Sequence, residues 1–274
     1  MDFLARETVA FPEGFWDSLD KTVVNSVKQN LTGRKFLPLY GPLGAGASNV
    51  QVDEVSVDGS SEEEESSGLV KRAGRTFVEL PQIFEDFTFN WRDIESSEKS
   101  GFPLDFTKAT LAAQRLAIKE DSLIFFGSEF LGSEGLLTAS GTSTLKRGDW
   151  AEGENAFLDV AKGLAEFRSK GIIGRYSLIL STDLYAKLYR IQPSLGIIEI
   201  DRISKMLDGN LFQSPALGKD KAVLVCAEAQ YMDLAVGLDI LTGYLETKDF
   251  NHVLRIMETA ALRLKCKDAV IKFE

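Results

Sequence analysis

Apolar residues near the start of the chain recur with the period of a helix. Between residues 13 and 31 they are spaced three or four positions apart, on one stripe: Trp16, Leu19, Val23, Val27 and Leu31. Gly33 follows as a stop signal. The pattern predicts an amphipathic helix, which must cover its stripe with the protein's own core or with a partner.

An extended pattern with a polar interruption then predicts a hairpin arm. Residues 35–40 have the pattern of a short extended run, and the Gly- and Pro-containing residues 41–46 predict a turn. Strand-like alternation follows in residues 50–57 and returns in residues 76–80. Between these two strands, residues 58–68 are too polar and too rich in adjacent Glu to pack in a core, so we expect a long solvated tip.

The rest of the chain predicts a mixed α+β fold, with helices segregated from antiparallel strands. An alanine-rich helix is predicted for residues 106–126, where small side chains allow close packing against a sheet, and a second helix for residues 156–169. Strands are predicted at 176–180, 222–227, 232–236, 242–245, 253–264 and 269–273.

Composition and charge narrow the choice of partners. The 274 residues are 44% apolar and 26% charged, which excludes disorder of the whole chain. The formal net charge of −10 argues against nucleic acid and anionic membranes, because binding to them needs clustered Lys and Arg. No run reaches the roughly 18 apolar residues of a membrane span, and the start lacks a secretion signal, so we expect a cytoplasmic protein.

The sequence offers little catalytic or metal-binding chemistry. His252 is the only histidine, which favours a structural role over a triad or a multi-histidine metal site. Residues 41–48 approach a phosphate-binding loop, but Ala47 stands where that loop needs Lys. Cys226 and Cys266 lie far apart in apolar runs, as buried reduced thiols do. We therefore predict no catalytic residue, no metal site and no enzymatic activity.

Several segments resemble the family 1 encapsulins, also called linocin-like shell proteins. They follow the family's order over nearly the whole chain: Leu31-Thr32-Gly33-Arg34-Lys35-Phe36, Tyr40-Gly41-Pro42-Leu43-Gly44-Ala45-Gly46, Trp91-Arg92-Asp93-Ile94-Glu95, Glu120-Asp121 with Ile124-Phe125-Phe126-Gly127, Gly135-Leu136-Leu137, Gly174-Arg175-Tyr176-Ser177-Leu178-Ile179-Leu180-Ser181 and Asp233-Leu234-Ala235-Val236.

This resemblance implies the fold of tailed-phage major capsid proteins, the Hong Kong 97 type, with a peripheral domain, an axial domain and an extended hairpin arm. The parts implied are an N-terminal arm (1–12), the N-terminal helix and start of the peripheral domain (13–48), the hairpin arm (49–80), the peripheral domain (81–136), the axial domain (137–221) and a return to the peripheral domain (222–274).

The resemblance also implies two functional regions. An apolar groove on the inner wall would hold a peptide from the C-terminus of a cargo protein, on side chains matching Val27, Leu31, Arg34, Leu39, Asp239, Ile240 and Tyr244. In it, Arg34 would orient the peptide backbone or a carboxylate. An uncharged loop would line a pore at the five-fold axis: Ile191, Gln192, Pro193, Ser194, Leu195 and Gly196.

The implied function is a shell subunit that assembles with copies of itself into a hollow icosahedral particle. The expected cargo is a ferritin-like protein for iron mineralisation and storage, with a dye-decolourising peroxidase as the alternative. A prophage capsid protein that packages DNA is the rival interpretation.

The sequence pattern around Trp91 predicts a strand, with the indole either in the core or stacked on a flat ligand. Some relatives bind flavin there, but the following Arg92-Asp93-Ile94 is typical of shells without flavin, so no cofactor is expected.

Overall fold

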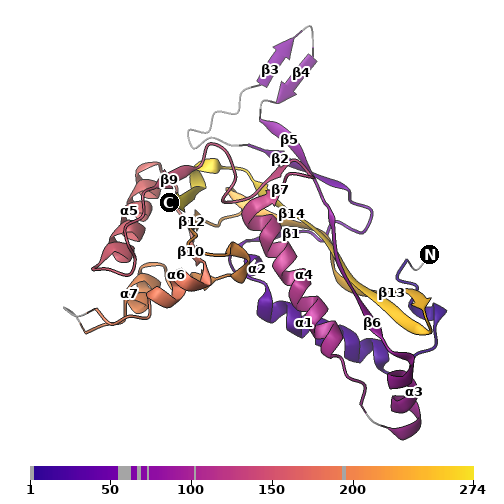
Figure 1. Ribbon diagram of the computed structural model, residues 1–274. Coiled ribbons are helices and arrows are strands. Elements are labelled where there is room, and N and C mark those ends of the chain that lie inside the picture. The colour runs from indigo at the N-terminus through magenta and orange to yellow at the C-terminus, as the bar shows by residue number, and fades with distance from the viewer. Residues whose placement is uncertain (1–2, 55–62, 67–68, 73, 102, 193–195) are drawn as a thin grey trace.

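Two sheets share one continuous hydrophobic core, and an arm projects away from both (Figure 1). The computed structural model describes residues 3–54, 63–66, 69–72, 74–101, 103–192 and 196–274. None of the helices in this described part of the chain combines the length and apolar character that a bilayer span requires.

The sheet with the longer strands, here called the larger sheet, has four strands among the described residues. Its strand order is β1 (Leu39–Tyr40), β13 (Met232–Lys248), β14 (Asn251–Leu264) and β6 (Gln82–Phe89). Helices α1 (Phe15–Asn30) and α4 (Thr107–Phe126) pack against each other and against this sheet. The alanines of α4 at 109, 112, 113 and 117 are fully buried, which confirms that small side chains bring this helix close to its neighbours.

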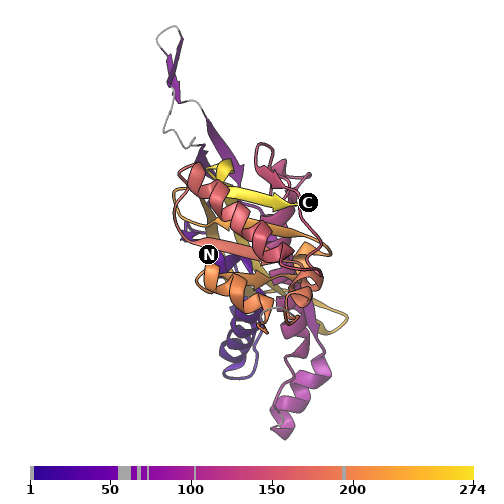
Figure 2. The same ribbon diagram turned by 90° about the vertical axis from the view of Figure 1, so that its left-hand side faces the viewer.

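The other sheet, here called the smaller sheet, has five strands in the described part of the chain, and all are short. Their order is β11 (Leu211–Gln213), β10 (Tyr176–Leu180), β12 (Ala222–Cys226), β15 (Val270–Phe273) and β9 (Ser143–Leu145). Helices α5 (Asn155–Ser169), α6 (Thr182–Lys187) and α7 (Glu199–Met206) surround it (Figures 1 and 2). Because β12 and β15 belong to it, this sheet crosses the expected domain boundary at residue 221.

The remaining elements are short or belong to the arm. They are α2 (Gly33–Phe36), α3 (Trp91–Ser100), β2 (Asn49–Asp53), β3 (Glu63–Ser66), β4 (Leu69–Arg72), β5 (Arg75–Glu79), β7 (Gly127–Ser128), β8 (Ser133–Glu134) and the 3-10 turns η1 (Arg6–Thr8), η2 (Pro215–Leu217) and η3 (Lys267–Ala269). Strands β2 and β5 pair antiparallel as the base of the predicted arm.

Four local expectations need correction. The acidic tip is not entirely loop, because residues 63–66 form β3 and pair with β4. Residues 33–36 form a helical turn, so only the end of the run 35–40 is a strand. The segments 232–236 and 242–245 belong to one strand. Trp91 begins a helix, because Asn90 caps α3 by accepting a hydrogen bond from the amide of Arg92 at 2.9 Å.

Both cysteines are buried and free, as predicted. Burial raises the pKa of Cys226 to about 12 and raises the pKa of Cys266 as well. Neither thiol is therefore a reactive thiolate at neutral pH.

The fold makes a prediction about helix α4. Leu116 is fully buried and Leu111 is 47% exposed on the same helix. Truncating Leu116 to Ala leaves a cavity, so we expect L116A to lower the free energy of unfolding by about 2–5 kcal/mol and L111A to lower it far less. Denaturant unfolding of the purified chain, followed by tryptophan fluorescence, measures both; equal losses would contradict the packing described for α4.

Candidate functional site

A groove between α1 and β13 brings together most of the residues expected to hold a peptide. It encloses about 340 Å³. The residues that line it are Val24, Val27, Lys28, Leu31, Arg34, Lys35, Leu39, Asp239 and Ile240. Six of the seven expected residues are among them, and Tyr244 is not.

Helix α1 supplies the first wall. Val24, Val27 and Leu31 are spaced by three and four residues, so their side chains share one side of the helix and of the turn that ends it. Sequence reasoning missed Val24, although its spacing from Val27 was the available signal. The exposed Lys28 and Lys35 add positive charge at the rim.

A close approach between α2 and α4 positions Arg34. A Cβ atom on Gly33 would lie 2.3 Å from Cδ1 of Ile124, so a side chain there would displace the Ile124 side chain. The amides of Thr32 and Gly33 donate to the carboxylate of Asp121 at 3.0 and 2.8 Å. Burial raises the pKa of Asp121 to about 6. These contacts hold α2 on α4 and direct Arg34 toward the groove.

An irregular stretch of β13 supplies the opposite wall. Its register against β14 shifts twice between residues 236 and 241. A side chain at Gly237 would crowd this stretch, because a Cβ atom would lie 2.5 Å from Oγ1 of Thr259. That hydroxyl accepts a hydrogen bond from the amide that follows Gly237, at 2.7 Å. Bulges of this kind redirect side chains, and here Asp239 and Ile240 line the groove.

Four ionisable side chains meet beside these walls. Arg34 donates to Glu120 through Nε and Nη2, at 2.9 and 2.6 Å, and to Asp239 through Nη1, at 2.7 Å. Its Nη2 also pairs with Glu258. Burial alone would lower the pKa of Arg34, but the hydrogen bond and charge of Glu120 raise it. Burial raises the pKa of Glu258 well above its usual range, and the charge of Glu120 raises it further.

Arg34 therefore has a structural task. Its three guanidinium nitrogens all donate to carboxylates, and Glu120 and Glu258 are almost completely buried while Asp239 is exposed. The cation joins α2, α4, β13 and β14, so it fixes the position of α2, which brings Arg34 and Lys35 to the groove, relative to the β13 wall. Neither Glu120 nor Glu258 was expected in this role.

Tyr244 lies outside the groove and belongs to an aromatic group at the end of α1. Its hydroxyl is 2.5 Å from Oγ1 of Thr247, and its ring centroid is 6.2 Å from that of Phe11. His252 lies 5.1 Å from Phe11 in the same group, and burial lowers its pKa. Among the described residues, no group of three or more His, Cys, Asp or Glu could hold a metal ion.

The predicted pore loop is described only at its two ends, since residues 193–195 lie outside the described residues. Ile191 is 64% exposed. Gln192, in contrast, is buried and donates through Nε2 to the carbonyl of Gly153 at 2.9 Å. The amide of Gly196 bonds to the carbonyl of Gln192 at 2.8 Å. The side chain of Gln192 is thus tied to the preceding loop, and the pore remains a prediction.

Trp91 lies on the surface, which corrects the expectation of core packing. Its side chain is 41% exposed, and the guanidinium of Arg92 lies 5.4 Å from its ring centroid. Its amide donates to Oδ1 of Asn251 at 3.3 Å. That no flavin binds at this position remains a prediction.

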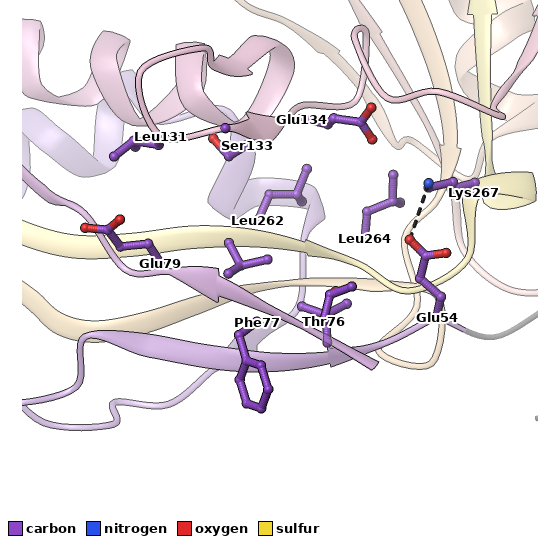
Figure 3. Close-up of a pocket in the computed structure, with 13 residues that line it drawn as sticks. Glu54, Thr76, Phe77, Glu79, Leu131, Ser133, Glu134, Leu262, Leu264 and Lys267 are labelled. Atoms are coloured by element: carbon purple, nitrogen blue, oxygen red, sulfur yellow. Dashed lines mark ion pairs between the residues drawn. The ribbon is translucent and has the colours of Figure 1, made fainter. Parts of the chain in front are cut away.

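A second hollow of about 290 Å³ lies at the base of the arm (Figure 3). Strands β2 and β5, residues 131–134 and the end of β14 line it. Its walls mix the apolar Leu262 and Leu264 with an ion pair of 3.3 Å between Lys267 and Glu54. This hollow is separate in its lining residues from the groove at α1.

Comparison with known proteins decides the family. The profile of a family described as "encapsulating protein for peroxidase" matches residues 1–261. The type 1 encapsulin shell protein EncA of Myxococcus xanthus is 36% identical over 279 aligned positions, covering 100% of this chain and 96% of that protein. The chain belongs to the encapsulin shell proteins. A diheme-cytochrome–encapsulin shell fusion protein of Kuenenia stuttgartiensis is 35% identical to this encapsulin, over 94% of this chain and 72% of that protein.

Solved structures confirm the fold of this encapsulin. A virus-like particle from Pyrococcus furiosus superposes with a TM-score of 0.76 at 20% identity, covering 96% of this chain and 100% of that one. The capsid of the myovirus XM1 gives 0.61 at 13% identity, covering 88% and 90%. The predicted phage major-capsid fold is thus confirmed, and the encapsulin is a structural shell subunit rather than an enzyme.

The buried ion cluster of this encapsulin predicts a large effect of losing Arg34. In R34A the carboxyl groups of Glu120 and Glu258 stay buried without their cation, so we expect a loss of about 3–5 kcal/mol in the free energy of unfolding. Denaturant unfolding measures the loss. As a matched control, R75A removes an arginine whose ion pair with Asp53 joins side chains that are 36% and 32% exposed, and should change stability little. A small effect of R34A would refute the structural role of Arg34.

The cluster also predicts a pH dependence. Because the folded state holds a proton on Glu258 to a higher pH than the unfolded chain does, this group lowers stability as pH rises above the ordinary glutamate range and through the folded pKa. In E258Q the group cannot ionise, so stability should fall less over that rise. Unfolding midpoints of both chains between pH 4.5 and pH 8 provide the test; parallel curves would show that Glu258 does not titrate as described.

Proposed function

We propose that this chain builds a hollow icosahedral compartment in the cytoplasm and that its α1–β13 groove captures a cargo protein by a peptide at the cargo's C-terminus. The family membership supports assembly from many copies. The groove supports capture, because an apolar trough with polar rims is a common way to bind an extended peptide.

The contacts available in the groove favour recognition through side chains. The amide of Leu238 donates to Thr259 and that of Ile240 to its neighbour Asp239, so the bulged stretch of β13 offers few free amides to a peptide backbone. Apolar side chains of a peptide would instead pack against Val24, Leu39 and Ile240.

Charge then sets the orientation of the peptide. Lys28 and Lys35 lie on the α1 side of the groove, and the 68% exposed Asp239 lies on the β13 side. A peptide with an acidic group toward α1 and a basic group toward β13 would satisfy both rims.

Assembly would cover the large apolar side chains that a single chain leaves in water. They include Phe130 at 96% exposure, Phe250 at 79%, Ile173 at 71% and Phe77 at 67%. Exposed apolar residues of this size are typical of interfaces, and closed symmetry buries the same surfaces on every copy. Copies of the chain itself are therefore the main partners we propose.

Two cargo classes are proposed. The resemblance favours a ferritin-like protein, which would give the compartment a role in iron mineralisation, storage and protection against oxidative stress. The family description, which names a peroxidase, favours the dye-decolourising peroxidase as the second candidate. Iron content and haem absorbance of purified loaded particles distinguish the two.

Substitution of the groove tests capture. Leu39 is 55% exposed and Ile240 is partly exposed, so L39D with I240D should leave folding intact while placing two charges in the apolar groove. We expect hollow megadalton particles that no longer co-purify with cargo, as seen by light scattering, negative-stain imaging and mass spectrometry.

The matched control is L43D. Leu43 is exposed and follows Leu39 on the same segment, but it does not line the groove, so this variant should load normally. Unchanged loading of the L39D and I240D double variant would refute capture by this groove. Small oligomers of the unsubstituted chain would refute the compartment itself.

A further inference from the structure

Along α1 and β13 the groove is followed directly by the chain's own N-terminal segment, and the two stretches together are here called the trough. We infer that residues 3–9, here called the N-terminal strap, are a displaceable occupant of this trough. A cargo peptide that is longer than the unoccupied part of the trough must displace the strap. This inference rests on the proposed capture of cargo in the groove.

Backbone contacts along the outer edge of β13 show which part of this strand is free to contact a peptide. Leu43 and Gly44 donate backbone hydrogen bonds to the carbonyls of Val236 and Gly237, at 3.0 and 2.9 Å. Beyond the bulge, the amide of Tyr244 donates to the carbonyl of Leu4 at 2.8 Å. The groove lies between the segment of residues 43–44 and the N-terminal strap, which each cover one part of the β13 edge.

Arg6 of the strap marks the start of the second cover. Its Nε and Nη2 donate to the carbonyl of Thr242 at 3.0 and 2.8 Å. Residues 238–241 of β13 therefore form the open stretch. At about 3.3 Å per residue, it accommodates about four residues of extended peptide.

The strap also occupies the same side of α1 as the groove. Arg6 forms two hydrogen bonds of 2.8 Å to the carboxylate of Asp20, and its guanidinium lies 4.7 Å from the ring centroid of Trp16. Asp20 precedes the groove residue Val24 by four positions, which is about one helical turn. On both α1 and β13, the residues that contact the strap thus lie next to the residues that line the groove.

The strap is more accessible to water than the charged cluster below the groove. None of its residues is buried, and its 3-10 turn η1 has no side-chain cap. Its ion pair joins Arg6 and Asp20, whose side chains are 22% and 37% exposed, so water reaches both partners. The Arg34 cluster below the groove, in contrast, includes two carboxylates with at most 1% exposure. Displacement would therefore release the strap before it disturbed the groove.

Hydrogen exchange on assembled particles tests the inference. Loaded particles are separated from empty ones by density, and mass spectrometry identifies the enclosed protein. We expect the amide of Thr8, which donates to the carbonyl of Ala5 within the strap, to exchange faster in loaded particles, because cargo has displaced the strap. Equal or slower exchange in loaded particles would overturn the inference.

A variant of Gly243 tests the same point from the strap's side. A Cβ atom on Gly243 would lie 3.2 Å from the carbonyl oxygen of Leu4, so G243V pushes the strap away while retaining a residue that suits a strand. We expect faster exchange of the strap amides and a higher ratio of cargo to shell protein. The matched control is G46V, because a Cβ atom there meets nothing within 4 Å.

A second variant guards against misfolding of G243V. R6A removes the tie to Asp20 and Thr242 at the surface and should act in the same direction. If both variants free the strap but loading stays equal or falls, the strap is a fixed wall and the inference fails. That outcome differs from failure of the proposed function, in which the L39D and I240D double variant would load normally.

Discussion

The ion cluster around Arg34 ties together elements that are far apart in the sequence. Glu120 lies 86 positions from Arg34, Asp239 lies 205 and Glu258 lies 224, yet all three carboxyl groups bond to the same guanidinium. A buried cation among buried carboxyl groups tolerates little change in spacing, because any gap leaves a charge or a hydrogen-bonding group without its partner. The spacing of α2, α4, β13 and β14, and with it the β13 wall of the groove, therefore depends on this one cluster.

Periodicity alone predicted much of the fold. The stripe from Trp16 to Leu31 gave helix α1, and the alanine-rich pattern of residues 106–126 gave α4. It did not give the continuity of β13, because the bulges there break the alternation of apolar and polar residues. The turn α2 was also missed, since Asp121, far away in sequence, caps its amides.

The candidate site came from a resemblance to known shell proteins, and the structure brings six of its seven residues into one groove. Residue types could not show that Arg34 is already occupied by carboxylates, because Glu120 and Glu258 look like ordinary surface residues in the sequence. Nor could they show that Leu4 and Phe11 cover the neighbourhood of Tyr244. Long-range contacts of this kind carry no local signal.

The two buried thiols have a practical consequence for chemical labelling. Cys226 and Cys266 are the chain's only cysteines, and burial keeps both in the unreactive protonated form. A cysteine introduced at the groove rim, for example in place of Lys28, would therefore be the one thiol of each subunit that reacts with a maleimide. Every copy in a closed particle would then carry a single, identically placed dye, nanogold cluster or drug molecule.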